Sequence, residues 1–180
     1  SMLASSMTAL KEIVTHRPEL VEALFEPVAY DRRGEVAEGQ KPFLTIPVYN
    51  WYQGFLSCIY HRTYINSAQR YEDAPKLTES QSEALNELDR ILNDPVIHLK
   101  MRLKPGDMQF VYNHCMLHDR TEFEDWEDAK KKRHLLRLWL SLPEDRPLPP
   151  VYAQRYGDLT IGRRGGIITE QTVLQAPIFD

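Results

Sequence analysis

Residues 108–142 have the sequence MQFVYNHCMLHDRTEFEDWEDAKKKRHLLRLWLSL, and this stretch decides how the chain is expected to fold. An apolar segment over 108–112 runs into a polar cluster over 113–118, and a charged loop then leads to a second apolar segment over 133–140. Both segments have the alternating pattern of β-strands, in which successive side chains point to opposite faces. We therefore expect strands over 108–113 and 133–140 that neighbour or face each other in one core.

The second segment predicts a two-sided strand. One face would carry Arg133, Leu135, Arg137 and Trp139, and the other face, expected in the core, would carry His134, Leu136, Leu138 and Leu140. A strand rise near 3.3 Å per residue separates the two arginines by about 13 Å. A guanidinium inside a barrel is unfavourable unless an anion meets it, and its planar fork suits a carboxylate. A histidine at the end of one strand and arginines along the next would suit a metal beside a carboxylate-bearing cosubstrate.

Four features of this region carry a family resemblance: Gly106-Asp107-Met108, Asn113 five residues before His118, His118-Asp119-Arg120, and Arg133-His134-Leu135-Leu136-Arg137. Together they resemble the C-terminal signature of the TauD/TfdA-like family of Fe(II)- and 2-oxoglutarate-dependent dioxygenases. The resemblance implies that His118 is the distal iron-binding histidine and that Arg133 clamps 2-oxoglutarate. It also implies that Arg137 lies near cosubstrate or substrate and that Asn113 supports the site.

The family's other two iron ligands form a His-x-Asp or His-x-Glu motif, which this sequence lacks. The residues two positions after its six histidines are Pro18, Thr63, Lys100, Met116, Arg120 and Leu136. The opening residues 1–7 resemble the family segment that begins at a Gly-Gly-x-Thr/Ser turn downstream of that motif. On this resemblance Ser1 falls where a hydroxyl often touches 2-oxoglutarate. We expect one domain over 1–180 that is the C-terminal part of a dioxygenase domain, incomplete at its N-terminal side and inactive by itself.

The activity that the resemblance implies is oxidation of a small organic substrate by O2, with Fe(II) as cofactor and 2-oxoglutarate as cosubstrate converted to succinate. The favoured interpretation is a fragment or truncated chain of such an enzyme. The alternative is a non-catalytic jelly-roll binding or scaffold protein that has lost its iron site. A homo-oligomer or a complementing N-terminal segment would be the corresponding protein partner.

Composition excludes other classes of function. The 180 residues carry a net charge of −4, and both signs are interspersed, so a broad basic surface for nucleic acid or membrane is not expected. No apolar run approaches the length of a membrane span, and the start lacks a signal-peptide pattern. Two cysteines, Cys58 and Cys115, give neither a disulfide framework nor metal-type spacing. The expected setting is reducing and cytoplasmic.

Each candidate residue has a plainer interpretation. His114 and His118 are four residues apart, the spacing of a helical zinc pair, but the β-rich flanks argue against a helix. Arg133 and Arg137 could be paired with carboxylates of the charged loop. Cys115 is most simply a small buried residue.

Elsewhere the chain predicts helices around its strands. Ser5 or Ser6 caps a helix to about Thr15 with Leu10, Ile13 and Val14 on one face, and further helices are expected over 19–25 and from Thr78 to Asp94. Strands are expected over 43–49, 54–60 and 97–103, and a short helix is expected near 152–156. The expected fold is mainly β with flanking helices (α+β), which the resemblance specifies as a double-stranded β-helix, or jelly roll.

Overall fold

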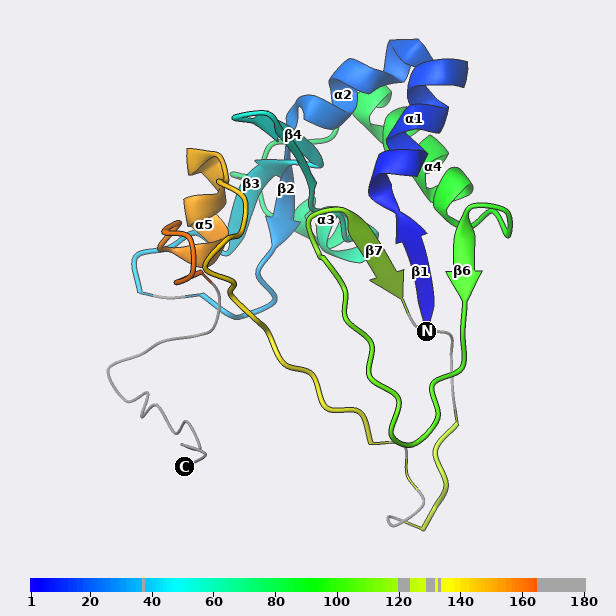
Figure 1. The fold of residues 1–180 in the computed structure, drawn as a ribbon. Coiled ribbons are helices and arrows are strands. Elements are labelled where there is room, and N and C mark those ends of the chain that lie inside the picture. The colour runs from blue at the N-terminus through cyan, green and yellow to red at the C-terminus, as the bar shows by residue number, and fades with distance from the viewer. Residues whose placement is uncertain (37, 120–123, 129–131, 133, 165–180) are drawn as a thin grey trace.

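A computed structural model of the chain describes residues 1–36, 38–119, 124–128, 132 and 134–164 (Figure 1). The helices are α1 (Ser6–His16), α2 (Val21–Phe25), α3 (Arg62–Ala68), α4 (Glu79–Leu92) and α5 (Ala153–Tyr156), with 3-10 turns at Pro18–Leu20 and Pro150–Tyr152. The strands are β1 (Met2–Ser5), β2 (Pro27–Asp31), β3 (Phe43–Pro47), β4 (Tyr49–Tyr52), β5 (Phe55–Cys58), β6 (His98–Lys100) and β7 (Met116–Asp119). The described part is thus a mixed α/β structure.

The strands form three small antiparallel sheets. One sheet has the order β6-β1-β7, and the other two are the pairs β2-β3 and β4-β5. Figure 1 shows β1 between β6 and β7, with α1 continuing directly from β1 and α4 leading into β6. The described residues do not show the expected jelly roll directly.

The sequence signals for α4 are confirmed. Thr78 accepts a hydrogen bond from the backbone N–H of Gln81 at 3.1 Å, and the Gln81 side chain accepts one from the backbone N–H of Thr78 at 3.1 Å. This capping box satisfies two donors that a helix start would otherwise leave unpaired. Leu85, Leu88 and Ile91 are buried along one stripe of the helix.

Helix α1 begins as predicted, but one of its three expected core positions is wrong. Ser5 caps it by accepting a hydrogen bond from the backbone N–H of Thr8 at 3.1 Å. Leu10 and Ile13 are buried, whereas Val14 is half exposed. Successive residues are about 100° apart around an α-helix. Val14, which follows Ile13 directly, therefore points away from the face of α1 that packs against α4.

The main core joins these helices to the two-stranded sheets. Its largest fully buried side chains include Ile13, Leu24, Val28, Ile46, Val48, Tyr49, Ile65, Leu85, Leu88 and Tyr152. The core therefore lies above the three-stranded sheet in the view of Figure 1, between α1, α2, α4 and the sheets β2-β3 and β4-β5. No helix within the described residues is long and apolar enough to cross a membrane.

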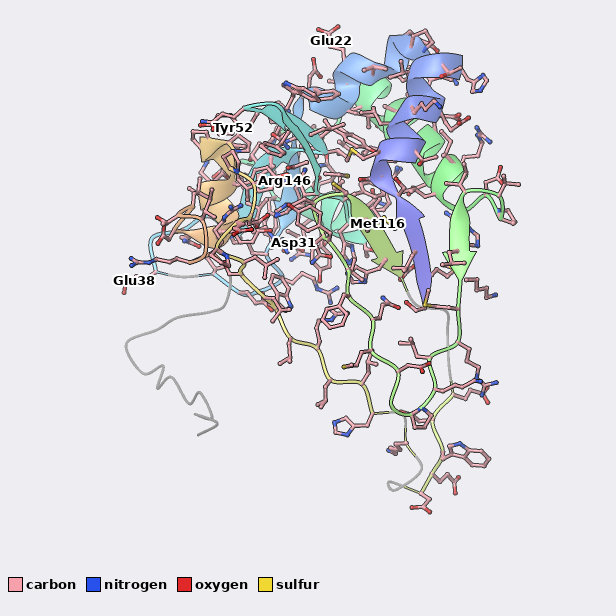
Figure 2. All side chains as sticks on the ribbon, in the orientation of Figure 1. Glu22, Asp31, Glu38, Tyr52, Met116 and Arg146 are labelled. Carbon is pink, nitrogen blue, oxygen red and sulfur yellow. The ribbon has the colours of Figure 1, made fainter. Side chains whose placement is uncertain are left out.

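The prediction of strands over 108–113 and 133–140 is wrong for all the described residues in these ranges. Residues 108–113 and 134–140 have no strand, and Arg133 lies outside the described residues. Met108 and Phe110 are 82% and 78% exposed, and Leu136 and Leu138, expected in the core, are 81% and 83% exposed. A strand requires a hydrogen-bonded neighbour, and residues 108–113 and 134–140 pair with no described strand. Figures 1 and 2 show these segments as long excursions below the sheets, with side chains standing apart from the dense body of the molecule.

The other expected strands are confirmed in shorter form. The strand predicted over 43–49 is β3, followed directly by β4, and the one predicted over 54–60 is β5. The prediction over 97–103 is reduced to β6, which covers three residues. The helix expected over 152–156 is present as the last 3-10 turn and α5.

Candidate functional site at strand β7

His118 lies in β7, a strand that begins after a tight turn rather than at the end of the predicted 108–113 strand. Two contacts fix this turn to the core. The backbone N–H and the hydroxyl of Ser6 both donate to the carbonyl oxygen of Cys115, at 2.9 and 2.7 Å. The backbone N–H of Cys58 donates to the carbonyl oxygen of His114 at 2.9 Å. The start of α1 and the end of β5 therefore set where β7 enters the sheet.

The register of the sheet determines which way His118 faces. Leu3 of β1 pairs with His118 on one side and with Leu99 of β6 on the other. Their neighbours Ala4 and Leu117 occupy the opposite face, where Leu117 packs against the main core. Since side chains alternate along a strand, His118 points away from the helix-packed core.

Ser1 lies on the same face as His118. Its terminal amine donates to the carbonyl oxygen of Met101 at 2.8 Å, and the Met101 N–H donates back to the Ser1 carbonyl oxygen at 2.9 Å. This exchange continues the β1-β6 pairing beyond Met2. Ser1 is two residues from Leu3, so it shares the Leu3 face and therefore the His118 face.

Arg137 also acts on His118, although it lies in no strand. The pKa of His118 is lowered from its ordinary value, first by partial burial of the imidazole and second by the positive charge of Arg137. The carboxylate of Asp119 acts in the opposite direction. The neutral imidazole that results is the form that can bind a metal ion.

Asn113, another predicted site residue, is exposed in the turn before β7. Arg133 lies outside the described residues, so its predicted role stays a prediction. The described residues contain no group of three or more His, Cys, Asp or Glu side chains that could hold a metal ion. His118 is a single candidate ligand, and the described part of the chain does not complete a metal site around it.

His114 and Cys115 have structural surroundings of their own. His114 Nε2 lies 3.5 Å from Asp145 Oδ2, and burial is the largest cause of its lowered pKa. Arg146 donates to Cys115 Sγ at 3.2 Å and to the Leu56 carbonyl oxygen at 2.5 Å. Figure 2 shows Arg146 inside the dense body of side chains. Cys115 is thus half-buried with a charged partner, not a fully buried apolar residue, and His114 and His118 do not share a helix.

A second group of side chains near β7 was missed by the sequence analysis. The ring of His61 stacks on that of Tyr64 at 3.7 Å between centroids, and the Arg33 guanidinium lies 5.4 Å from the centre of the Tyr64 ring. The charges of Asp119 and Arg33 both act on His61. It was missed because no local pattern links Arg33 to residues 61–64.

Comparison with known proteins gives consistent results. The family model for the taurine catabolism dioxygenase TauD, TfdA family matches residues 1–139. The chain is 32% identical over 149 residues to FR-33289 synthase from Streptomyces rubellomurinus, a match that covers 82% of this chain and 44% of that protein. It is also 32% identical over 141 residues to taurine hydroxylase-like protein SAT17 from Stachybotrys chartarum, covering 77% of this chain and 35% of that protein. The chain therefore spans less than half the length of these curated relatives.

Proposed function

The chain belongs to the TauD/TfdA dioxygenase family, and from that membership we propose that the complete protein is an Fe(II)- and 2-oxoglutarate-dependent dioxygenase that oxidises a small organic substrate. The observation that carries the proposal is the face of the three-stranded sheet that His118 shares with Ser1, with the charge of Arg137 acting on His118. A neutral imidazole, a hydroxyl-bearing residue and a guanidinium form a group suited to a metal beside an anionic cosubstrate.

In this proposal His118 supplies one metal ligand through its neutral imidazole. A histidine and a carboxylate from outside the described residues would complete the family's ligand set, in a longer protein of which this chain is a part. The described part would then be one portion of a jelly roll. The relatives' greater length is compatible with this, since the matched regions cover 44% and 35% of them.

The arginines would hold the cosubstrate. Arg133 would donate two charge-assisted hydrogen bonds to the far carboxylate of 2-oxoglutarate, and Arg137 would lie nearer the metal side or the substrate. The Ser1 hydroxyl would add a hydrogen bond to the same molecule, and Asn113 would support the turn into β7. When bound, the iron supplies oxygen activation, coupled to the decarboxylation of 2-oxoglutarate to succinate.

The chain's own residues would do two further things. The positive charge of Arg137 disfavours protonation of His118, which keeps the imidazole nitrogen available as a ligand. The aliphatic residues Leu3 and Leu99, which share the face of His118, would help to exclude water from the reacting group.

The test is succinate formation by the complete protein with Fe(II), 2-oxoglutarate and O2, compared with its His118→Ala variant. We expect succinate from the wild type and none above background from the variant. Without His118 the iron would keep only two of its three protein ligands and would be bound too weakly to support the reaction. The matched control is His16→Ala, which removes an exposed histidine from the far end of α1 and should leave succinate formation unchanged. Absence of succinate from the wild type, with the fold intact, would favour the non-catalytic binding or scaffold protein.

A further inference from the structure

We propose that Asp145 and Arg146 position His118, by fixing the turn over residues 112–115 that leads into β7. Both are positioning residues, which act through the backbone of this turn. They lie beyond residues 1–139, the range that the family model matches, and no role follows for them from the family motif. The inference rests on the proposed function only in taking His118 as a metal ligand.

Tyr112 connects the turn to the first residue of β7. Its carbonyl oxygen accepts hydrogen bonds from the backbone N–H groups of Cys115 and Met116, both at 3.0 Å. Met116 begins β7 and lies two positions before His118 on that strand. A displacement of Tyr112 would therefore be passed through two hydrogen bonds to the strand that carries His118.

The hydroxyl group of Tyr112 is fixed by the later segment of the chain. It donates to Oδ1 of Asp145 at 2.7 Å and accepts from Nε of Arg146 at 2.9 Å. The Arg146 guanidinium also lies over the Tyr112 ring, 4.8 Å from its centre. A phenol that donates to one charged group and accepts from another is held in one orientation by both bonds.

His114 and Cys115 are held by the same two residues. Nη2 of Arg146 donates to Sγ of Cys115 at 3.2 Å, and Oδ2 of Asp145 lies 3.5 Å from Nε2 of His114. Asn113, in contrast, is exposed. The turn is thus attached to the later segment through each of its side chains except that of Asn113.

Asp145 and Arg146 are themselves fixed to the body of the molecule. Nη1 of Arg146 donates to the carbonyl oxygen of Leu56 in β5 at 2.5 Å. The buried Arg164 donates through Nη2 to the carbonyl oxygen of Arg146, and its Nη1 lies 3.7 Å from Oδ2 of Asp145. Hydrogen bonds to charged groups are stronger than those between neutral groups, so these contacts give the turn a rigid support.

Strand β7 needs such support because of its place in the sheet. Within the described residues the sheet order is β6-β1-β7, so β7 pairs with β1 alone. A shift of this pairing by one residue would turn His118 to the face that Leu117 now occupies. A working site holds its ligands to within about 0.5 Å, which requires support from surrounding residues. The contacts of Asp145 and Arg146 supply that support at the start of the strand.

The first test removes one hydroxyl group and measures metal affinity. Tyr112→Phe keeps the ring but loses the bonds to Asp145 and Arg146. In the complete protein we expect its affinity for Mn(II), measured by electron paramagnetic resonance without 2-oxoglutarate, to fall about tenfold. This is the lower end of the effect of losing a group that orients a metal ligand. The Fe(II) requirement of succinate formation should rise with it, whereas the 2-oxoglutarate requirement should change little.

Tyr60→Phe is the matched control. The Tyr60 hydroxyl donates to Oδ1 of Asp89 in α4 at 2.5 Å, so this variant also loses a bond from a tyrosine to a carboxylate. It should lose comparable stability in urea unfolding and keep the Mn(II) affinity of the wild type. Equal weakening of Mn(II) binding in Tyr60→Phe and Tyr112→Phe would show that affinity only follows stability, and would overturn the inference.

Arg146→Lys tests the second positioning residue. Lysine keeps the positive charge but cannot reproduce the separate bonds of the guanidinium to Tyr112, Leu56 and Cys115. We expect Mn(II) affinity to fall at least as far as in Tyr112→Phe. Wild-type affinity in Arg146→Lys would overturn the role given to Arg146.

A second measurement needs no metal. Amide hydrogen exchange over residues 116–119 of the iron-free protein should be faster in Tyr112→Phe than in the wild type, and unchanged in Tyr60→Phe. Exchange in β7 that is the same in the wild type and in Tyr112→Phe would show that the turn does not hold the strand, and would overturn the inference.

The outcomes separate this inference from the proposed function. Mn(II) binding that is weakened in Tyr112→Phe, in a protein that forms no succinate, would overturn the proposed function and leave this inference in place. Succinate formation together with wild-type Mn(II) affinity in Tyr112→Phe would overturn this inference alone.

Discussion

Leu3 of β1 lies directly opposite His118 of β7 in the three-stranded sheet. This pairing joins the first residues of the chain to the proposed metal ligand and puts Ser1 on the same face. The orientation of His118 therefore depends on β1 as well as on β7. Two measurements on His118 follow from this arrangement and from the nearby charge of Arg137.

The first concerns protonation of His118. Its pKa should be below the ordinary histidine value, because partial burial and the Arg137 charge both disfavour the imidazolium form. Arg137→Gln removes one of these causes and should raise the pKa of His118 toward the ordinary value. NMR titration of the histidine ring signals measures both. An Arg137→Gln variant in which the His118 titration does not move would show that the two side chains do not interact in solution.

The second concerns metal affinity of this chain by itself. Only His118 is proposed as a ligand, and the described residues hold no cluster of three metal-binding side chains. Isothermal titration with Mn(II) or Fe(II) under anaerobic conditions should show weak, poorly saturable binding. Tight binding of one metal per chain would mean that a different set of ligands exists, and His118→Ala would then show whether His118 belongs to it.

The sequence predicted the helices better than the strands expected over 108–113 and 133–140, and the reason is physical. The Thr78 cap and the apolar stripe of α4 depend on residues within a few turns of one another, so local pattern suffices. The alternation over 133–140 also has the pattern of a strand, but strand formation requires a partner that local sequence cannot supply. His118 was proposed from its motif and stays a prediction, whereas His61 and Arg33 were missed. They are brought together by Asp31, whose contacts with residues 67–71 are long-range.

A buried carboxylate at Asp31 should make stability depend on pH. The pKa of Asp31 is lowered in the folded protein: burial opposes this, but hydrogen bonds from Ser67, the Arg33 N–H and Tyr71 outweigh it. A carboxylate with a depressed folded pKa adds stability above its unfolded pKa and loses it as the pH falls toward the folded value. The loss should therefore occur below about pH 4, since the unfolded pKa of Asp is about 3.9.

Asp31→Asn should lower the free energy of unfolding at neutral pH by about 1–3 kcal/mol, the penalty of leaving buried hydrogen-bonding groups poorly paired. Its stability should also change less between about pH 5 and pH 2 than that of the wild type. Urea unfolding at several pH values measures both effects. The control is Asp73→Asn at an exposed position, and an equal pH response in the two variants would contradict the role given to Asp31.

The capping box of α4 should contribute measurably to stability. Thr78→Ala removes the acceptor for the Gln81 N–H and should lower the free energy of unfolding by about 1 kcal/mol. Ser80→Ala, at an exposed position in the same turn, is the matched control and should have a much smaller effect. Chemical denaturation of the two variants compares them. Equal stability of Thr78→Ala and wild type would mean that tertiary packing alone determines where α4 begins.

The last prediction separates the two arginines of the family motif in the complete enzyme. Arg133 should hold the distal carboxylate of 2-oxoglutarate, so Arg133→Ala should raise the 2-oxoglutarate requirement. Losing a buried charged partner costs roughly 2–5 kcal/mol, or about thirty- to several thousandfold in affinity. Arg137→Ala should instead leave the 2-oxoglutarate requirement closer to that of the wild type and reduce coupling to substrate oxidation. Succinate formation against 2-oxoglutarate concentration, measured in both variants, compares the two positions.

Arg133→Lys keeps the charge but loses the planar guanidinium fork. Partial recovery of 2-oxoglutarate affinity in that variant would separate the effect of charge from that of bidentate geometry. An Arg133→Ala enzyme with an unchanged concentration dependence would move the clamp to another residue, and a large change in Arg137→Ala would identify Arg137 as that residue.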